Sequence, residues 1–329
     1  MPLKIGTLII DPPVALAPMA GITSNPFRVL AREQGCRLLY SEMVSAKGMA
    51  FNQSRSNSLL YFTEAERPIG IQLFGSDPHI LAGAAAEIEK MGADFIDLNL
   101  GCPAKKITSN GEGGALMRDP ALCSKIFKTL TAAVSCPVTV KLRKGWNSQS
   151  VNVLDIAARA EEAGMAAITV HGRTVDQGYS GRADWEVIKQ VKEQVSIPVI
   201  GNGDIDSAGA ALEMIKHCRC DGVMVGRASR GNPWIFAEIS AAFKGSPLPD
   251  PPTPDEIVDM ALRHFSLLSE FKGEAAAARE MRRHCAWYIR GLPGAAAARQ
   301  HLVQISSYAE TEKILRSFAA EVASCAGES

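Results

Sequence analysis

Eight short runs of apolar and β-branched residues recur through the first two thirds of the chain, and they constrain its fold more than any other feature. The runs cover residues 14–17, 38–41, 68–73, 95–98, 138–142, 167–170, 199–201 and 222–225. Each run has the length of a β-strand and is too short for a typical helix. The pattern therefore predicts eight strands.

The segments between these runs carry signals for helices. An Asn or Asp stands directly before a proline at Asn25-Pro26, Asp77-Pro78, Asp119-Pro120 and Asn232-Pro233. Such side chains cap helices, and proline is favoured at the first helical position. Apolar strands that alternate with helices indicate right-handed βαβ units around a parallel sheet. Eight units predict an α/β fold, the closed (β/α)8 TIM barrel. The alternative is a doubly wound open sheet, but the sequence has no G-x-G-x-x-G turn after the first run, where such a fold places it.

The composition changes after the last predicted unit. Residues 245–255 read GSPLPDPPTPD, with five prolines in eleven residues, which is typical of a stiff linker. Beyond it, residues 257–270, 274–290 and 295–318 are rich in Ala, Leu, Arg and Glu, so we expect helices there. The predicted organisation is a barrel over 1–245, a linker over 246–255 and a small all-α domain over 256–329.

Composition and charge exclude several classes of protein. Hydrophobic residues make up 47% of the 329 positions and the net charge is zero, so a basic coat is excluded and any nucleic-acid site must be local. The chain shows neither a signal peptide nor a long apolar span, and its eight cysteines form no C-x-x-C pair. We expect a reduced cytoplasmic monomer without a membrane segment. The nearest approach to a metal cluster is His217, Cys218 and Cys220, and we predict no metal there.

Residues with a possible role in binding or catalysis, most of them polar, follow every predicted strand at its carboxyl end, where TIM barrels assemble their active sites. These positions hold Pro18-Met19-Ala20, Glu42, Gln72, Asn99 with Cys102, Lys141, His171 with Arg173, Asn202-Gly203-Asp204 and Gly226-Arg227. Loop ends are wet, so any one of these residues alone has an ordinary structural explanation. Their recurrence after all eight strands favours a functional site.

The last two of these loops resemble the phosphate cup that barrels form after strands seven and eight. Glycines let backbone N–H groups approach an anion, and Arg227 adds a positive charge. The alternative is that the glycines only make tight turns. A phosphate cup fits a sugar phosphate as well as a flavin nucleotide. The amides of Gln72 and Asn99 suit the uracil-like edge of a flavin or a base, and Lys141 suits negative charge on a reduced flavin.

Several long motifs closely resemble those of the tRNA-dihydrouridine synthases, in particular the bacterial B type. The motifs are LAPMAGIT from Leu16, IQLFG from Ile71, DLNLGCPAKK from Asp97, VKLRKGW from Val140, HGRTVDQGYSGRADW from His171, GNGD from Gly201 and VGRASRGNPW from Val225. The resemblance implies an FMN enzyme that uses NADPH to reduce a D-loop uridine of tRNA. It implies FMN contacts from Pro18, Met19, Ala20, Gln72, Lys141, His171, Asn202, Gly203, Asp204, Gly226 and Arg227. Asn99 and Cys102 would meet the uridine.

For the chemistry, we expect Cys102 to act as the general acid that protonates C5 of the uridine, because an ordinary thiol is protonated at neutral pH. A nucleophilic thiolate and a packed apolar cysteine are the alternatives. A uridine inside folded tRNA must leave its stack to react, so recognition by shape is expected.

The positive charge of the tail predicts where tRNA binds. Residues 272–301 hold six cations against two carboxylates, a net of +4, and the cations include Arg279, Arg282 and Arg283. We also expect Arg173 and Lys105, at the barrel mouth, to contact the substrate. The alternative is that the tail is a solvated helix face, and the RNA site would then lie at Arg173, Arg182 and Lys105. Other classes stay open at this stage: a flavin barrel acting on a small molecule, a phosphosugar enzyme without flavin, and an RNA-binding regulator.

Overall fold

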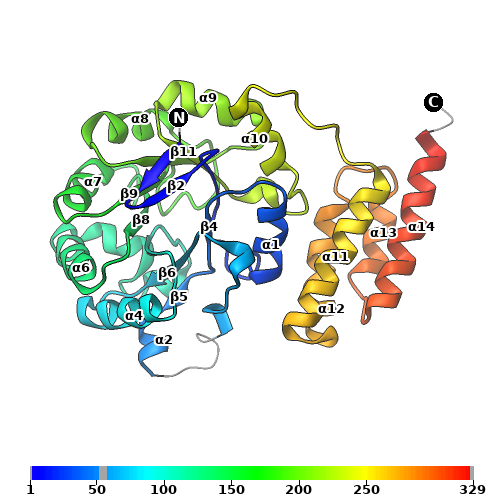
Figure 1. The fold of residues 1–329 in the computed structure, drawn as a ribbon, viewed down its shortest axis with the longest axis horizontal. Coiled ribbons are helices and arrows are strands. Elements are labelled where there is room, and N and C mark those ends of the chain that lie inside the picture. Colours follow the sequence, from blue (N-terminus) through cyan, green and yellow to red (C-terminus); the bar gives the residue numbers. More distant parts are fainter. Residues whose placement is uncertain (1, 52–57, 327–329) are drawn as a thin grey trace.

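The computed structural model describes residues 2–51 and 58–326, and its main body is a closed barrel of parallel strands (Figure 1). The barrel strands are β3 (Val14–Leu16), β4 (Leu39–Tyr40), β6 (Ile69–Phe74), β7 (Phe95–Leu100), β8 (Val138–Arg143), β9 (Ala167–His171), β10 (Val199–Asn202) and β11 (Gly222–Val225). A short strand, β5 (Val44–Ser45), also pairs with β6. The backbone N–H of Leu16 donates to the carbonyl of Leu38 at 3.0 Å, which joins the first barrel strand to the second. The predicted barrel is confirmed, and each predicted strand lies within two residues of an observed one.

Helices surround the barrel. They are α1 (Asn25–Glu33), α4 (Pro78–Lys90), α6 (Pro120–Ala133), α7 (Val153–Glu162), α8 (Trp185–Gln194), α9 (Ala208–Cys218) and α10 (Ile235–Lys244). Shorter helical turns are α2 (Ala46–Ala50), α5 (Lys105–Thr108), η1 (Glu64–Glu66), η2 (Gly113–Arg118) and η3 (Arg227–Ser229).

Two of the four predicted helix caps are confirmed and two are wrong. The Asp77 carboxylate accepts from the N–H groups at the start of α4, and Asp119 does the same for α6. Asn25 is instead the first residue of α1, the cap position belongs to Ser24, and the Asn25 side-chain amide donates to the buried carboxylate of Glu66. Asn232 lies in a turn before α10, where its backbone N–H donates to the carbonyl of Ser229.

Side chains alternate between the inside and the outside of the barrel along each strand. On β7, Ile96, Leu98 and Leu100 pack in the main hydrophobic cluster with residues of the surrounding helices. Phe95 belongs instead to the cluster inside the barrel. A β-carbon on Gly70 would lie 2.2 Å from the Phe95 ring, so only glycine leaves room for that ring.

A hairpin that the sequence analysis missed closes the amino-terminal end of the barrel. Strands β1 (Leu3–Ile5) and β2 (Leu8–Ile10) pair antiparallel, and Leu3, Ile5 and Ile10 pack with the interior side chains. Because apolar side chains fill this end, the polar side chains of the interior can gather only at the opposite, carboxyl end.

Within residues 254–326, four helices follow the barrel, and they lie beside it as a separate bundle (Figure 1). They pack around their own hydrophobic cluster. They are α11 (Pro254–Lys272), α12 (Glu274–Tyr288), α13 (Ala295–Leu302) and α14 (Tyr308–Ala326). Helix α11 begins at Pro254, within the segment predicted as a linker, with Thr253 and Glu256 forming a capping box. The single helix predicted over 295–318 is wrong, because the chain turns between α13 and α14. Ser307 caps the new helix by accepting from the N–H of Glu310 at 3.2 Å.

The helical unit packs against the barrel through α1. The Phe27 ring of α1 lies 5.7 Å from the ring of His264 and 6.2 Å from that of His284. Gly231, in the loop before α10, approaches Trp287 so closely that a β-carbon there would lie 2.3 Å from the Trp287 carbonyl carbon. These contacts place α12 beside the loops at the carboxyl end of the barrel. Within the part of the chain that is described, no helix has the length and apolar character needed to cross a membrane.

Candidate active site

A cavity of about 1410 Å³ opens at the carboxyl ends of the barrel strands. Typical small-molecule pockets measure roughly 300–1,000 Å³, so this cavity has room for more than one ligand. All eleven residues predicted to bind the cofactor line it, together with Asn99, Cys102 and Arg173. Lys105, Arg279, Arg282 and Arg283 do not line it. The structure thus brings the predicted barrel residues together in one place.

A network of buried polar side chains lies beneath this cavity. The Asp97 carboxylate is fully buried and accepts from the Thr139 hydroxyl at 2.6 Å and from Gln72 Nε2 at 2.7 Å. Burial raises the pKa of Asp97 to about 6, while the hydrogen bonds from Thr139 and Gln72 oppose the increase. Gln72 Oε1 in turn accepts from Asn99 Nδ2 at 2.8 Å.

Cys102 lies in a loop that is held from two sides. Asn99 Oδ1 accepts from the backbone N–H of Cys102 at 2.9 Å, and the Cys102 carbonyl accepts from the N–H of Gly114 at 3.1 Å. Arg143 Nε donates to the neighbouring carbonyl of Gly101 at 2.8 Å. Burial raises the pKa of the Cys102 thiol above its ordinary value. The thiol is therefore protonated at neutral pH, as a proton donor requires.

Lys141 lines the cavity, and its ammonium group makes one hydrogen bond to the protein. Lys141 Nζ donates to Asn202 Oδ1 at 3.0 Å, and Asn202 Nδ2 donates to the Met224 carbonyl at 2.8 Å. Burial and the nearby charge of Arg143 lower the pKa of Lys141 to about 7, while Asp97 opposes this decrease. An ammonium group has three N–H donors, so an anion or a carbonyl oxygen bound in the cavity would find donors that the protein leaves free.

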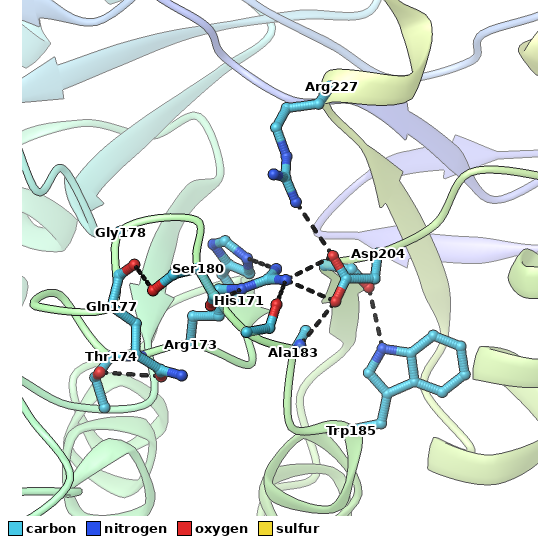
Figure 2. A network of polar contacts seen from close by, with 12 residues as sticks. His171, Arg173, Thr174, Gln177, Gly178, Ser180, Ala183, Trp185, Asp204 and Arg227 are labelled. Carbon is cyan, nitrogen blue, oxygen red and sulfur yellow. Dashed lines mark hydrogen bonds and ion pairs between the residues drawn. The ribbon is translucent and has the colours of Figure 1, made fainter.

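An ion-paired network supports the side of the cavity built by the loops after β9, β10 and β11 (Figure 2). Arg173 is only 2% exposed, and its guanidinium donates to Asp204 at 2.8 Å as well as to the carbonyls of Ser180 and Gly181. Asp204 also accepts from Arg227 at 3.2 Å. Arg173 was predicted to bind the substrate, and in this structure its guanidinium donates to groups of the protein itself.

The electrostatics of this network leave one histidine neutral and one carboxylate charged. Burial, followed by the charges of Lys141 and Arg143, lowers the pKa of His171 far below its ordinary value. Burial raises the pKa of Asp204, but hydrogen bonds from the Ala183 amide and Arg173 outweigh it, so the pKa is lowered overall. The ionised Asp204 carboxylate therefore holds Arg227 at the rim of the cavity, 4.9 Å from the centre of the Tyr179 ring.

Three residues of this site escaped the sequence analysis. Asp97 lies two residues before Asn99 on β7, and Arg143 lies two residues after Lys141 on β8, so period-two alternation along each strand would have found both. Tyr179 lines the cavity from a loop and is 56% exposed, and no local pattern marks it.

The residues predicted to contact tRNA are scattered. Arg282 Nε donates to the carbonyl of Ile305 at 2.9 Å, which ties α12 to the turn before α14. Arg283 donates to the carbonyl of Gly21 in the loop after β3, and its guanidinium lies 5.2 Å from the centre of the Trp287 ring. Arg279 and Lys105 are exposed. Arg283 is thus the predicted tail residue that contacts a loop of the barrel mouth.

The segment considered for metal binding is engaged in other contacts. His217 Nε2 lies 3.3 Å from a carboxylate oxygen of Glu186, and the Cys218 thiol donates to the carbonyl of Trp185. Over residues 2–51 and 58–326, no three His, Cys, Asp or Glu side chains are grouped so that they could hold a metal ion.

Comparisons with known proteins agree on one family. A family model described as "Dihydrouridine synthase (Dus)" matches residues 15–323. "Probable tRNA-dihydrouridine synthase" of Rickettsia bellii (strain RML369-C) is 42% identical over 295 residues, which are 89% of this chain and 90% of that protein. "tRNA-dihydrouridine synthase B" of Pseudomonas aeruginosa is 40% identical over 310 residues, which are 94% of this chain and 92% of that protein.

Solved structures show the same fold at low sequence identity. A structure described as "a variant of NCR from zymomonas mobilis" superposes with a TM-score of 0.56 and 16% identity, covering 79% of this chain and 97% of that chain. A 2-naphthoyl-CoA reductase complex superposes with a TM-score of 0.57 and 12% identity, covering 75% of this chain and 52% of that chain. At such identities the likeness concerns the fold alone.

Proposed function

Because this chain belongs to the dihydrouridine synthase family, it is an oxidoreductase that acts on tRNA, and we propose that it reduces a D-loop uridine with bound FMN and NADPH. The family supplies the class of reaction. The identity of the cofactor, the reductant and the roles of single residues rest on the geometry of the cavity.

The observation that carries the proposal is the partly buried Lys141 ammonium group. Burial lowers its pKa to about 7, its Nζ donates to Asn202 Oδ1 at 3.0 Å, and Lys141 lines the cavity. Such a group fits the pyrimidine edge of a flavin, where reduction places negative charge. Arg227 at the cavity rim, beside Gly226 and Gly203, fits a phosphate group at the other end of the same ligand.

The other residues predicted to bind the cofactor would hold the isoalloxazine and ribityl parts of FMN. These residues are Pro18, Met19, Ala20, Gln72, His171, Asn202 and Asp204. His171 would act as a neutral hydrogen-bonding group, because burial and the surrounding cations lower its pKa. When bound and reduced by NADPH, FMN supplies the hydride that C6 of the uridine receives.

Cys102 would complete the reaction by giving the proton that C5 requires. Its thiol is protonated at neutral pH because burial raises its pKa, and it lines the same cavity as Lys141. Nucleophilic attack would need a thiolate, which the same burial disfavours. Asn99 lies at the same end of β7 and would orient the uracil through its amide.

We further propose that residues 1–245 carry the chemistry and that residues 256–329 help to bind tRNA. Arg279 and Lys105 are exposed, and Arg283 lies where α12 meets the barrel mouth. These cations would meet phosphates, which position an RNA without reading its bases. The uridine would be extruded from its stack in order to enter the cavity.

The absorption spectrum of the purified protein and its reaction with tRNA test this proposal. We expect a yellow protein that releases FMN on heating, is bleached by NADPH without oxygen, and regains its colour when tRNA lacking dihydrouridine is added. Dihydrouridine should then appear in the D-loop. A colourless protein that cannot be loaded with FMN would overturn the cofactor assignment, and recovery of colour by free uridine alone would overturn the tRNA requirement.

A further inference from the structure

A chain of hydrogen bonds beneath the cavity links the carboxylate of Asp97 to the loop that carries Cys102. Asp97 accepts from Gln72 Nε2 at 2.7 Å, Gln72 Oε1 accepts from Asn99 Nδ2 at 2.8 Å, and Asn99 Oδ1 accepts from the Cys102 N–H at 2.9 Å. We call these four residues the Asp97 relay. Asp97 itself is not among the residues that line the cavity.

The groups at the two ends of the Asp97 relay fix which atom donates and which accepts in each of its hydrogen bonds. An ionised carboxylate can only accept hydrogen bonds, and a backbone N–H can only donate one. A side-chain amide has an oxygen at one end and an NH₂ group at the other. Gln72 and Asn99 therefore satisfy both ends in one orientation only. The exposed fractions of Asp97, Gln72 and Asn99 are 0%, 1% and 8%, so a lost hydrogen bond in the relay leaves a buried polar group unpaired at Asp97 and Gln72.

The Thr139 hydroxyl holds the carboxylate itself in place. It donates to Asp97 Oδ1 at 2.6 Å, while the other acceptor near it among the described residues, the Ile96 carbonyl, lies at 3.4 Å, well beyond the usual O–H···O distance of roughly 2.5–3.0 Å. Thr139 is thus a donor to Asp97, and the second carboxylate oxygen is left to face Gln72.

We propose that Asp97 is a positioning residue for this enzyme: through Gln72 and Asn99 its carboxylate sets the orientation of the Cys102 loop against the cavity. The inference rests on the proposed function of Cys102 as proton donor. Asp97 does not line the cavity, so it acts on the Cys102 loop through the amides that it orients. Its charge also favours the ammonium form of Lys141, which stands on the neighbouring strand.

Exchanging the amide and the carboxylate tests the direction of the relay. In Asp97→Asn, the Thr139 hydroxyl still donates to the oxygen of the new amide, so its NH₂ group faces the NH₂ group of Gln72. Gln72 and then Asn99 must turn over, which leaves the N–H of Cys102 without an acceptor. In Gln72→Glu, two carboxylates face each other. In the double variant, the new amide donates to the new carboxylate, and that carboxylate accepts from Asn99 as Gln72 does.

Turnover per bound flavin, at saturating FMN, should follow this logic. We expect Asp97→Asn and Gln72→Glu each to lower dihydrouridine formation by roughly tenfold to a hundredfold, the range for a buried polar group left unpaired. Turnover in the double variant should be at least roughly tenfold higher than in the less active of the two single variants. If its loss equals the product of the two single losses, the proposed direction of the relay is overturned.

A second readout does not depend on the proposed reaction. The alkylation rate of Cys102 by iodoacetamide, measured by peptide mass spectrometry, should change by roughly threefold or more in both single variants and return in the double variant. Cys136 is also partly exposed and lies before β8, so it serves as an internal control that should not change. Unchanged Cys102 alkylation in both single variants would overturn the positioning role even if Cys102 proves to be the proton donor.

A milder variant covers the case in which the single variants do not fold. Thr139→Val removes only the hydroxyl that holds Asp97 and should shift Cys102 alkylation in the same direction by a smaller factor. If Thr139→Val and wild type are alkylated at the same rate, the role of Asp97 is refuted. Conversely, if the relay variants behave as expected but Cys102→Ala makes dihydrouridine at the wild-type rate, the positioning survives and the assignment of the acid fails.

Discussion

Two buried histidines at the junction between the barrel and the helical unit should make the protein lose stability in mild acid. His264 and His284 are fully buried, and their ring centres lie 4.5 Å apart beneath the Phe27 ring. Tyr288 Oη lies 3.2 Å from His264 Nδ1, whereas neither ring nitrogen of His284 has a partner among the described residues. Burial lowers the pKa of His264 to about 3 and that of His284 well below its usual value.

The sign and size of the effect follow from these shifts. The pKa of histidine in the unfolded chain is about 6.5, so below that pH the two histidines bind protons in the unfolded state and stay neutral in the native state. The free energy of unfolding therefore falls as the pH drops from about 6.5 toward 3. Between pH 7 and pH 5 each such histidine costs about 2 kcal/mol, or about 4 kcal/mol for the pair. Most carboxylates titrate below this window, but Asp97, whose pKa burial raises to about 6, takes up a proton within it in the native state and offsets about 1 kcal/mol of the loss.

His284→Leu isolates one half of this loss. Because neither nitrogen of His284 is paired, the leucine variant should keep wild-type stability at pH 7 or exceed it, and its loss between pH 7 and pH 5 should be smaller by about 2 kcal/mol. Urea unfolding followed by tryptophan fluorescence measures this, since Trp287 lies 5.2 Å from the His284 ring. Phe27→Leu is the matched control and should lower stability equally at both pH values. An unchanged pH dependence in His284→Leu would refute the reasoning.

Three further predictions concern an ion pair, the cofactor and the RNA. Glu66→Gln should lower the free energy of unfolding by about 3–5 kcal/mol, because it leaves the buried Arg28 guanidinium, 2.6 Å from Glu66, without its counter-ion. The control is Glu64→Gln, on an exposed side chain of the same turn, which should leave the urea midpoint unchanged. Arg227→Ala should release flavin during dialysis and lower the melting temperature, with rescue by excess FMN, and full flavin retention would contradict its phosphate contact. Arg279→Ala with Arg283→Ala should raise the Kd for tRNA and reduce the salt dependence of binding, whereas Arg316→Ala on α14 should do neither; an unchanged salt slope would move the RNA site elsewhere.

The barrel was predictable because its signal is local and repeated. Each strand is a short apolar run, and the rule that sites form at carboxyl strand ends selected residues that do line one cavity. The amino-terminal hairpin was missed because its two strands have three residues each and read as one apolar stretch around Gly6 and Thr7. The break before α14 was missed although Ser307 and Glu310 have the spacing of a capping box.

Features that depend on packing between distant segments were beyond the sequence. Arg173 looks like a free cation at a loop mouth, yet Asp204, thirty-one residues later, buries and pairs it. Arg282 looks like part of a basic face, yet the Ile305 carbonyl accepts from it. The contact of Phe27 with His264 joins two units more than two hundred residues apart. No local periodicity encodes such partners, which only the folded chain brings together.

The most direct test of the account is a single turnover by enzyme whose flavin has been reduced in advance. Wild-type protein and Cys102→Ala would be reduced with NADPH without oxygen and mixed with tRNA that lacks dihydrouridine, and the product would be quantified over time. The account predicts equal rates of reduction by NADPH and a roughly 10²- to 10⁴-fold slower formation of dihydrouridine in the variant, the usual contribution of a positioned proton donor. Formation of dihydrouridine by Cys102→Ala at the wild-type rate would contradict it.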